Sequence, residues 1–286
     1  GLVGRNAVVE ISNTLDSKVR VPVSQAGGVW YVKGDDAYGL SDEESTITIP
    51  VKSDYDYTVD LPAWITGEKV KEGYNLTLAE NTTGNARKGT VTFTSERGAK
   101  KIVFLQFGIN DIAGTYEATY SVYGDNDQLV EETKTFKLVQ DVKNEELFYA
   151  EELSAIGGLV IPLKFDSETY QLSVFAGQYL GHIASKEWYL YTVVTSKAGY
   201  VHADAALAYS AIAEFDLDDE VVMPSFPFKD EKGFSFATSD GTIKSYLDGL
   251  EVYVFKSQSP SFSGGNALGY YDMFKNLSIK KVELKE

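Results

Sequence analysis

The chain has 286 residues, of which 43% are hydrophobic and 24% are charged, a balance typical of folded domains rather than disordered segments. Its formal net charge of −16 disfavours binding to nucleic acid or to anionic membranes, because both carry charge of the same sign. The absence of cysteine excludes disulfide bonds, thiolate catalysis and cysteine-ligated zinc.

The first predicted element is a β-hairpin close to the amino terminus. Residues 4–27 (GRNAVVEISNTLDSKVRVPVSQAG) alternate between apolar and polar side chains, which predicts antiparallel pairing of residues 6–12 with residues 17–24. A lone hairpin is marginally stable in water, so we expect its apolar face to pack on an apolar neighbour. That face carries Val9, Ile11, Val21 and Val23.

The same pattern returns at residues 85–108 (NARKGTVTFTSERGAKKIVFLQFG). Counted from the shared arginine or from the closing Gln-x-Gly, the apolar positions of the two segments coincide, and only the turn is longer in the first. Repetition would make residues 1–28 the terminal hairpin of a truncated preceding copy. The alternative is that residues 1–28 add strands to the domain that follows.

Between the two hairpins, the chain reads as further short strands. Residues 45–53 (STITIPVKS), 54–66 (DYDYTVDLPAWIT) and 74–81 (YNLTLAEN) have β-type composition and are separated by turn residues. Strands at this spacing indicate a β-sandwich, and residues 29–109 are about the size of one immunoglobulin-like domain. Trp64 stands in a strand-turn setting, so we expect its ring to be largely buried.

This region also carries a motif. The stretches AWIT, NLTLAENTTGNARKGTVTFTS and VFLQFG contain a tryptophan before an apolar residue, an Asn-x-small-x-x-Arg-x-Gly run and a closing Gln-x-Gly. In these features residues 29–109 resemble the BACON family, which implies an immunoglobulin-like module of Bacteroidetes proteins, named as carbohydrate-binding. One departure is Tyr57, where the family often has a second tryptophan. The matching positions are Trp64, Asn81, Arg87, Gly89, Val91, Gln106 and Gly108.

After a boundary at FGINDIAGTY, residues 110–286 are predicted to form a second all-β domain. Gly-Thr-Tyr before an alternating strand, together with VFAGQYLG, resembles lipocalin-like domains of Bacteroidetes lipoproteins. The resemblance implies an antiparallel β-barrel-like domain, which either holds one small ligand or is filled by side chains. The predicted strands are residues 115–123, 133–141, 146–153, 159–165, 169–176, 188–195, 206–215, 221–228, 233–239, 250–257 and 277–284.

Sequence signals for catalysis are scarce. The two histidines, His182 and His202, lack a His-Glu-x-x-His pattern, and the chain has no Gly-x-Ser-x-Gly elbow or phosphate-binding glycine loop. We therefore expect no enzymatic activity, no cofactor and no metal. Acidic runs at residues 34–36, 124–128 and 216–220 could offer oxygen ligands to Ca²⁺, but none follows the EF-hand pattern, and solvated turns are the preferred interpretation.

Aromatic side chains in polar or turn-like settings are the candidates for ligand contact. An aromatic ring can pack on the apolar face of a sugar while carboxylates or amides bond its hydroxyls. The segment SQSPSFSGGNALGYYD contains Gly-Gly-Asn, which predicts a loop at the mouth of the C-terminal domain. The predicted ligand-binding residues are Trp188, Asn266, Tyr270, Tyr271 and Asp272. Weaker candidates of the same kind are Trp30, Tyr31, Tyr38, Tyr55, Tyr57, Tyr189 and Tyr191.

Together these features predict a non-catalytic, exported lipoprotein of the outer-membrane surface or periplasm, whose anchor segment is not in this sequence. The expected partners are a poly- or oligosaccharide and proteins of a glycan-uptake system, without nucleic acid and without a direct membrane span. Two alternatives remain: a structural spacer or adhesion protein, and a lipocalin-like binder of a small apolar ligand. Any ligand site is expected in the C-terminal domain, because a small sandwich uses its inward positions to fill its own core.

Overall fold

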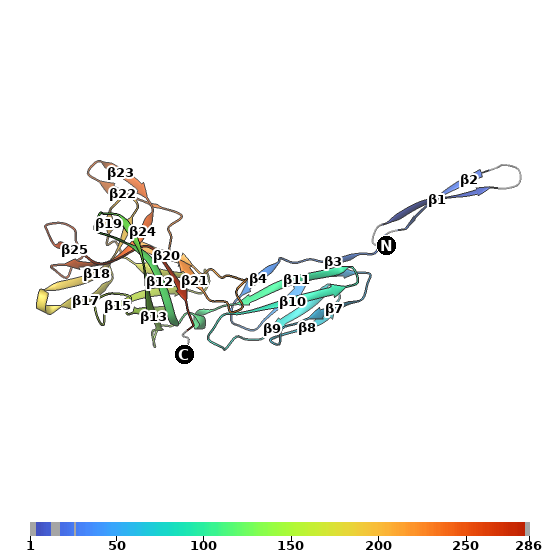
Figure 1. Ribbon diagram of the computed structural model, residues 1–286, viewed down its shortest axis with the longest axis horizontal. Coiled ribbons are helices and arrows are strands. Elements are labelled where there is room, and N and C mark those ends of the chain that lie inside the picture. The colour runs from blue at the N-terminus through green and yellow to red at the C-terminus, as the bar shows by residue number, and fades with distance from the viewer. Residues whose placement is uncertain (1–3, 13–17, 26, 284–286) are drawn as a thin grey trace. The chain divides into compact units, whose positions relative to one another are not determined.

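The computed structural model describes residues 4–12, 18–25 and 27–283, and it confirms the all-β fold (Figure 1). Apart from two short 3₁₀ turns, η1 (Ile109–Asp111) and η2 (Ala184–Lys186), its regular elements are strands. The chain divides into two compact units. Unit 1 consists of Gly1–Thr82 and Arg87–Phe107, and unit 2 consists of Thr83–Ala86 and Gly108–Glu286.

The amino-terminal hairpin pairs as predicted, but it is not covered. Strands β1 (Arg5–Ser12) and β2 (Lys18–Gln25) run antiparallel, while the turn between them, including Ser17, lies outside the described residues. The prediction that its apolar face packs on a neighbour is wrong, because the side chains of Val9, Ile11, Val21 and Val23 are between 40% (Val21) and 59% (Ile11) exposed. A two-stranded sheet has a single layer, so it cannot bury a face without a second layer against it.

The rest of unit 1 is a sandwich. One sheet has the order β4-β11-β10-β7, the other has the order β5-β9-β8, and β3 and β6 form a short ladder. The proline at position 50 separates β5 from β6, as expected for a residue that cannot donate to a ladder. The strands are β3 (Trp30–Val32), β4 (Ala37–Leu40), β5 (Ser45–Ile49), β6 (Val51–Ser53), β7 (Tyr57–Asp60), β8 (Ile65–Val70), β9 (Gly73–Leu78), β10 (Arg87–Ser95) and β11 (Gly98–Gln106).

The alternation of these strands produces the core of unit 1. Apolar side chains at every second position of β9, β10 and β11 meet between the two sheets and are fully buried. Trp64 is half-buried and packs against this core, so it is less enclosed than the sequence predicted. The buried residues are Ile49, Ile65, Leu76, Leu78, Val91, Phe93, Ile102 and Phe104.

Unit 2 is built on one long antiparallel sheet with the order β17-β18-β24-β25-β12-β13-β14-β15-β16-β20, to which β19 adds at β18 and β21 at β25. Strand β16 comes close to β18, and β20 to β24, so the sheet curls back toward itself. A separate hairpin consists of β22 and β23. The strands are β12 (Gly114–Tyr123), β13 (Leu129–Gln140), β14 (Leu147–Glu151), β15 (Val160–Asp166), β16 (Gln171–Phe175), β17 (Tyr179–Ile183), β18 (Trp188–Ser196), β19 (Val201–His202), β20 (Ala208–Ile212), β21 (Ser225–Pro227), β22 (Phe234–Thr238), β23 (Gly241–Ser245), β24 (Leu247–Phe255) and β25 (Ala267–Lys281).

One face of the curled sheet is continuously apolar from strand to strand. Phe136 lies opposite Tyr116 on the neighbouring strand, and Leu172 lies opposite Phe165. Aromatic rings therefore make up much of the buried core of this unit. The largest fully buried side chains of this unit are Tyr116, Phe136, Phe148, Phe165, Tyr209, Phe226 and Phe255.

The predicted loop at the end of the chain is shorter than expected. Strand β25 begins at Ala267, so Tyr270, Tyr271 and Asp272 lie in a strand rather than in a loop. The reason is pairing, because β24 provides an antiparallel partner along this segment, with two irregularities in its register between Val252 and Tyr253 and between Val254 and Phe255. Tertiary pairing has overridden the local preference of the sequence for a turn.

Candidate ligand-binding site

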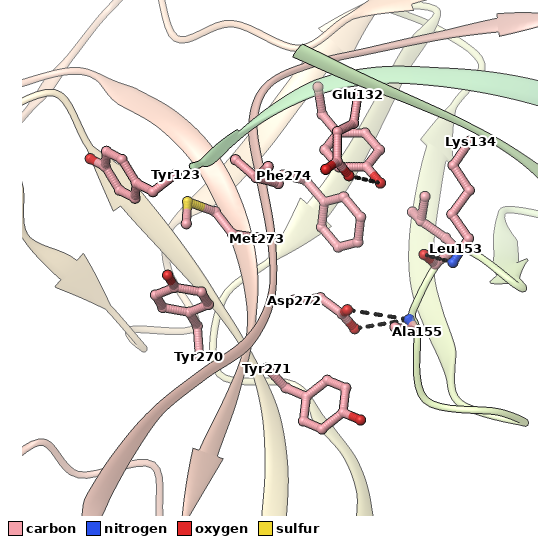
Figure 2. Close-up of a pocket in the computed structure, with 12 residues that line it drawn as sticks. Tyr123, Glu132, Lys134, Leu153, Ala155, Tyr270, Tyr271, Asp272, Met273 and Phe274 are labelled. Carbon is pink, nitrogen blue, oxygen red and sulfur yellow. Dashed lines mark hydrogen bonds between the residues drawn. The ribbon is translucent and has the colours of Figure 1, made fainter. Parts of the chain in front are cut away.

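A pocket of about 210 Å³ lies beside β25 (Figure 2). Its walls come from β12, β13, the segment after β14, and β25, so residues far apart in sequence meet there. Its volume is below the roughly 300–1,000 Å³ of sites for drug-sized ligands, so it suits one ring of a larger ligand. The lining residues are Tyr120, Val122, Tyr123, Glu132, Lys134, Leu153, Ala155, Tyr270, Tyr271, Asp272, Met273 and Phe274.

A β-bulge sets the directions of the two adjacent tyrosines. Asp272 lies opposite Val252, but Tyr270 lies opposite Tyr253, which leaves Tyr271 as the extra residue of β25. Such a bulge bends a strand and re-aims its side chains. Figure 2 shows Tyr270 and Tyr271 leaving the strand on opposite sides.

Tyr271 is joined by a second aromatic ring. The ring of Trp188, at the start of β18, lies 6.4 Å from the Tyr271 ring and nearly perpendicular to it. The Lys186 ammonium sits 4.2 Å above the Trp188 ring. Tyr271 is 42% exposed and Trp188 is half-buried, so the two rings form a partly open aromatic wall next to the pocket.

The carboxylate of Asp272 is held in place on this side of the strand. It accepts hydrogen bonds from Ser154 Oγ at 2.5 Å and from the Ala155 backbone amide at 3.2 Å. Lys134 Nζ donates to the carbonyls of Leu153 and Ser154 at 2.9 and 3.1 Å, which fixes the same segment. Since a carboxylate has about four acceptor positions, Asp272 keeps capacity for a further donor such as a sugar hydroxyl.

A second carboxylate lines the pocket. Glu132 Oε2 accepts a hydrogen bond from the Tyr120 hydroxyl at 3.4 Å. Burial raises the pKa of Tyr120, and the negative charges of Glu132 and Asp272 raise it further. The pocket therefore combines aromatic surface with two acidic groups and a neutral phenol.

The fifth predicted residue, Asn266, is engaged within its own loop. Its Nδ2 donates to the carbonyls of Ser259 and Ser261 at 2.8 and 3.1 Å, and its Oδ1 accepts from Ser257 Oγ at 2.8 Å. Both of its donor hydrogens are thus accounted for, and the side chain organises the loop before β25.

The sequence did not suggest Tyr120, Glu132, Lys134, Ser154 or Ala155. Glu132 and Lys134 lie in an alternating strand, where they read as ordinary solvent-facing residues. Ser154 bonds a carboxylate 118 positions away, which no local pattern can indicate. Tyr270, Tyr271 and Asp272 line the pocket, and Trp188 joins them through its contact with the Tyr271 ring. Tyr270 leaves β25 on the side opposite to Tyr271, and Asn266 forms hydrogen bonds within its own loop.

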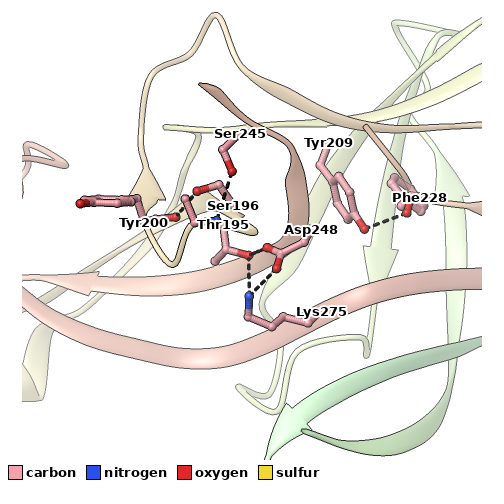
Figure 3. Close-up of polar contacts among 9 residues, drawn as sticks. Thr195, Ser196, Tyr200, Tyr209, Phe228, Ser245, Asp248 and Lys275 are labelled. Carbon is pink, nitrogen blue, oxygen red and sulfur yellow. Dashed lines mark hydrogen bonds and ion pairs between the residues drawn. The ribbon is translucent and has the colours of Figure 1, made fainter. Parts of the chain in front are cut away.

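A second polar cluster lies in the sheet of unit 2 (Figure 3). Lys275 Nζ pairs with Asp248 Oδ2 at 2.8 Å, and Thr195 Oγ1 donates to Asp248 Oδ1 at 2.7 Å. Lys275 and Thr195 are buried. The ammonium of Lys275 and the hydroxyl of Thr195 each bond one oxygen of Asp248, so the buried charges are paired and hydrogen-bonded. The cluster therefore has a structural role.

Neither histidine has the surroundings of a catalytic base. His182 is exposed and stacks on Tyr189 at 4.3 Å. His202 packs edge-on against Phe234 and Phe236, and its burial lowers its pKa. Within the described part of the chain, no group of three or more His, Asp or Glu side chains could hold a metal ion.

The motif residues of unit 1 are used inside that unit. Arg87 Nε donates to Gln106 Oε1 at 2.9 Å and Arg87 Nη2 to the Ala79 carbonyl at 2.6 Å, while the guanidinium lies 4.5 Å from the Trp64 ring centre. Gly89 leaves room for this ring, because a Cβ there would lie 2.8 Å from Trp64 Cζ2. The tryptophan, arginine, glycine and glutamine of the motif thus form one structural cluster.

No protein-family model matches the chain, and no curated protein is similar to it. Among solved structures, it is similar to a Bacteroides ovatus GH5 xyloglucanase in complex with a XXXG heptasaccharide, at 15% sequence identity and a TM-score of 0.25. The match covers 35% of this chain and 30% of that chain. A likeness of this extent does not establish a shared fold or activity. Of the helices in the described residues, none has the length and apolar character needed to span a membrane.

Proposed function

We propose that the protein is a non-catalytic glycan-binding protein whose unit 2 holds a sugar ring at the pocket beside β25. The observation that carries the proposal is the pairing of two partly exposed rings, Tyr271 and Trp188, with the anchored carboxylate of Asp272. A sugar ring needs this combination of an apolar platform and directional hydrogen-bond acceptors.

We further propose that unit 1 is a BACON-type module that acts as a spacer. The support is that Arg87, Gln106 and Trp64 of the motif form hydrogen bonds and packing contacts within unit 1, which is a structural use of these side chains. An exported, surface-attached protein of a glycan-uptake system is the setting in which such a spacer would present unit 2 to polysaccharide.

A glycan array probed with the whole chain tests the proposal, followed by titration calorimetry with the strongest ligand. Trp188→Ala and Tyr271→Ala should each weaken binding by about 1–3 kcal/mol, the scale of a lost aromatic contact. The matched control is Tyr179→Ala, which removes a tyrosine that is 48% exposed, against 42% for Tyr271, and that does not line the pocket. Unchanged affinity in both site variants, or a loss equal to that of the control, would contradict the assignment.

A further inference from the structure

The hairpin β1–β2 has the same register as the hairpin β10–β11 of unit 1. Arg5 lies opposite Gln25, as Arg87 lies opposite Gln106. Four residues further in, Val9 faces Val21 as Val91 faces Ile102. The two ladders therefore agree in strand direction, in pairing and in the position of their apolar and Arg–Gln pairs.

The two hairpins differ in what covers them. Val91, Phe93, Ile102 and Phe104 have no exposed surface in unit 1. Their counterparts in the first hairpin are Val9, Ile11, Val21 and Val23, which are 40–59% exposed. A row of apolar side chains at every second position is the pattern of a strand with one buried face, so the first hairpin has a face built for burial.

The opposite face of the first hairpin carries charged side chains of the kind that face solvent. Glu10 forms ion pairs with Lys18 and Arg20, each at 3.0 Å, and Arg20 lies directly across the ladder from Glu10. The hairpin is thus two-sided, with one mostly polar face, which also carries Val8 and Pro22, and one mostly apolar face, like an outer hairpin of a sandwich.

Unit 1 shows which elements cover such a hairpin. There β7 pairs antiparallel with β10, β4 pairs parallel with β11, and the sheet β5-β9-β8 covers the apolar face. All these strands precede the hairpin in the chain. We propose that β1–β2 is the last pair of strands of a further immunoglobulin-like sandwich, whose other strands come from polypeptide N-terminal to residue 1.

This occupant fits better than a second copy of the chain. Two hairpins packed face to face would cover the apolar rows but leave the outer edges of β1 and β2 without a partner strand. A sandwich provides a partner strand for both outer edges, as β7 and β4 do in unit 1. It would also provide Arg5 with a backbone carbonyl and an aromatic ring, as Ala79 and Trp64 do for Arg87.

A fusion protein tests whether the hairpin can complete a sandwich. Residues 29–86, which contain β3 to β9, are joined directly to residue 5 of the chain, because residue 86 precedes Arg87 as residue 4 precedes Arg5. In the fusion, the backbone amides of β1 and β2 should exchange hydrogen about 100-fold more slowly than in the unfused chain. Ile11→Asp should abolish this protection, whereas Val8→Asp on the charged face should preserve it.

Two further fusions make a failure interpretable. One adds residues 29–107 with their own hairpin and shows that the added module folds in this position. The other carries Ala7→Gly, Ile11→Phe and Val23→Phe, which restore the space left at Gly89 and the ring volume present at Phe93 and Phe104. If the first folds while β1–β2 stays unprotected in both hairpin fusions, the proposal is overturned.

The source of the covering strands is tested on the natural protein. The gene product that includes the residues encoded before Gly1 should show the same slow exchange in β1 and β2. Rapid exchange there would refute the proposal, as would a gene product without such residues. Light scattering should show whether the chain forms a dimer. A dimer that is lost in the Ile11→Asp variant would also refute the proposal, since a second copy of the chain would then cover the apolar face of the hairpin.

Discussion

At the scale of single residues, Glu251 on β24 is an ionisable group in an apolar setting. It is buried, and its Oε2 has no hydrogen-bond partner among the described residues. Burial raises its pKa to about 7, the nearby Lys275 acts in the opposite direction, and Asp248 adds to the rise. Between pH 4.5 and about 7, the Glu251 carboxyl group therefore holds a proton in the folded protein that it has released in the unfolded chain.

This difference predicts a pH-dependent stability. Because the folded-state pKa is the higher one, the contribution to stability is present below pH 4.5 and is lost as the pH rises to about 7. The expected loss is roughly 3 kcal/mol, and Glu251→Gln should remove it. Urea unfolding of unit 2 at pH 5 and pH 8 measures the change, with Glu117→Gln at an exposed position of β12 as the control. An equal pH dependence in both variants would contradict the assignment.

Gly89 tests the structural role of the motif in unit 1. A Cβ at this position would lie 2.6 Å from Pro62 Cγ and 2.8 Å from Trp64 Cζ2, so Gly89→Ala must displace the tryptophan. We expect a loss of about 1–3 kcal/mol in the unfolding free energy, as for other overpacked sites, together with a shift in tryptophan fluorescence. Gly39→Ala on β4, where a Cβ meets nothing within 4 Å, should change neither quantity.

At the scale of elements, alternation in the sequence was sufficient for the hairpins β1–β2 and β10–β11 and for most strands of unit 2. It was insufficient for β25, because Gly-Gly-Asn and two further small residues read as a loop until β24 supplies a partner. Trp188, Tyr271 and Asp272 could be named as candidates from residue type alone. Their grouping with Glu132 and Ser154 could not, since it depends on strand order and on one bulge.

The loop between β24 and β25 depends on Asn266. This side chain bonds two carbonyls and one hydroxyl of the loop, and Phe262 packs at 5.3 Å against Tyr253. Asn266→Ala should therefore speed limited proteolysis within residues 257–265 while leaving glycan affinity unchanged. Ser263→Ala is the milder control, because within the described residues the hydrogen bond of Ser263 Oγ is to Ser261 Oγ, two positions earlier in the loop. A loss of affinity in Asn266→Ala without faster cleavage would instead assign the amide to the ligand.

At the scale of the whole molecule, each of the two units has its own apolar core. Calorimetry should therefore resolve two unfolding transitions. Gly89→Ala should lower the midpoint of one, and Glu251→Gln at pH 8 should raise the midpoint of the other, because these residues belong to different units. If both substitutions moved a single common transition, the two cores would be one cooperative system.

The order of strands in unit 2 also has a consequence for synthesis. Strand β25, the last strand of unit 2, lies between β24 and β12, the first strand of the unit. The sheet therefore cannot be completed until the residues of β25 have left the ribosome, and contacts of such long sequence separation slow folding. Until β25 is synthesised, one edge of β12 and one edge of β24 remain without their partner strand. Nascent chains should thus depend on chaperones more than a protein of this size with local pairing would.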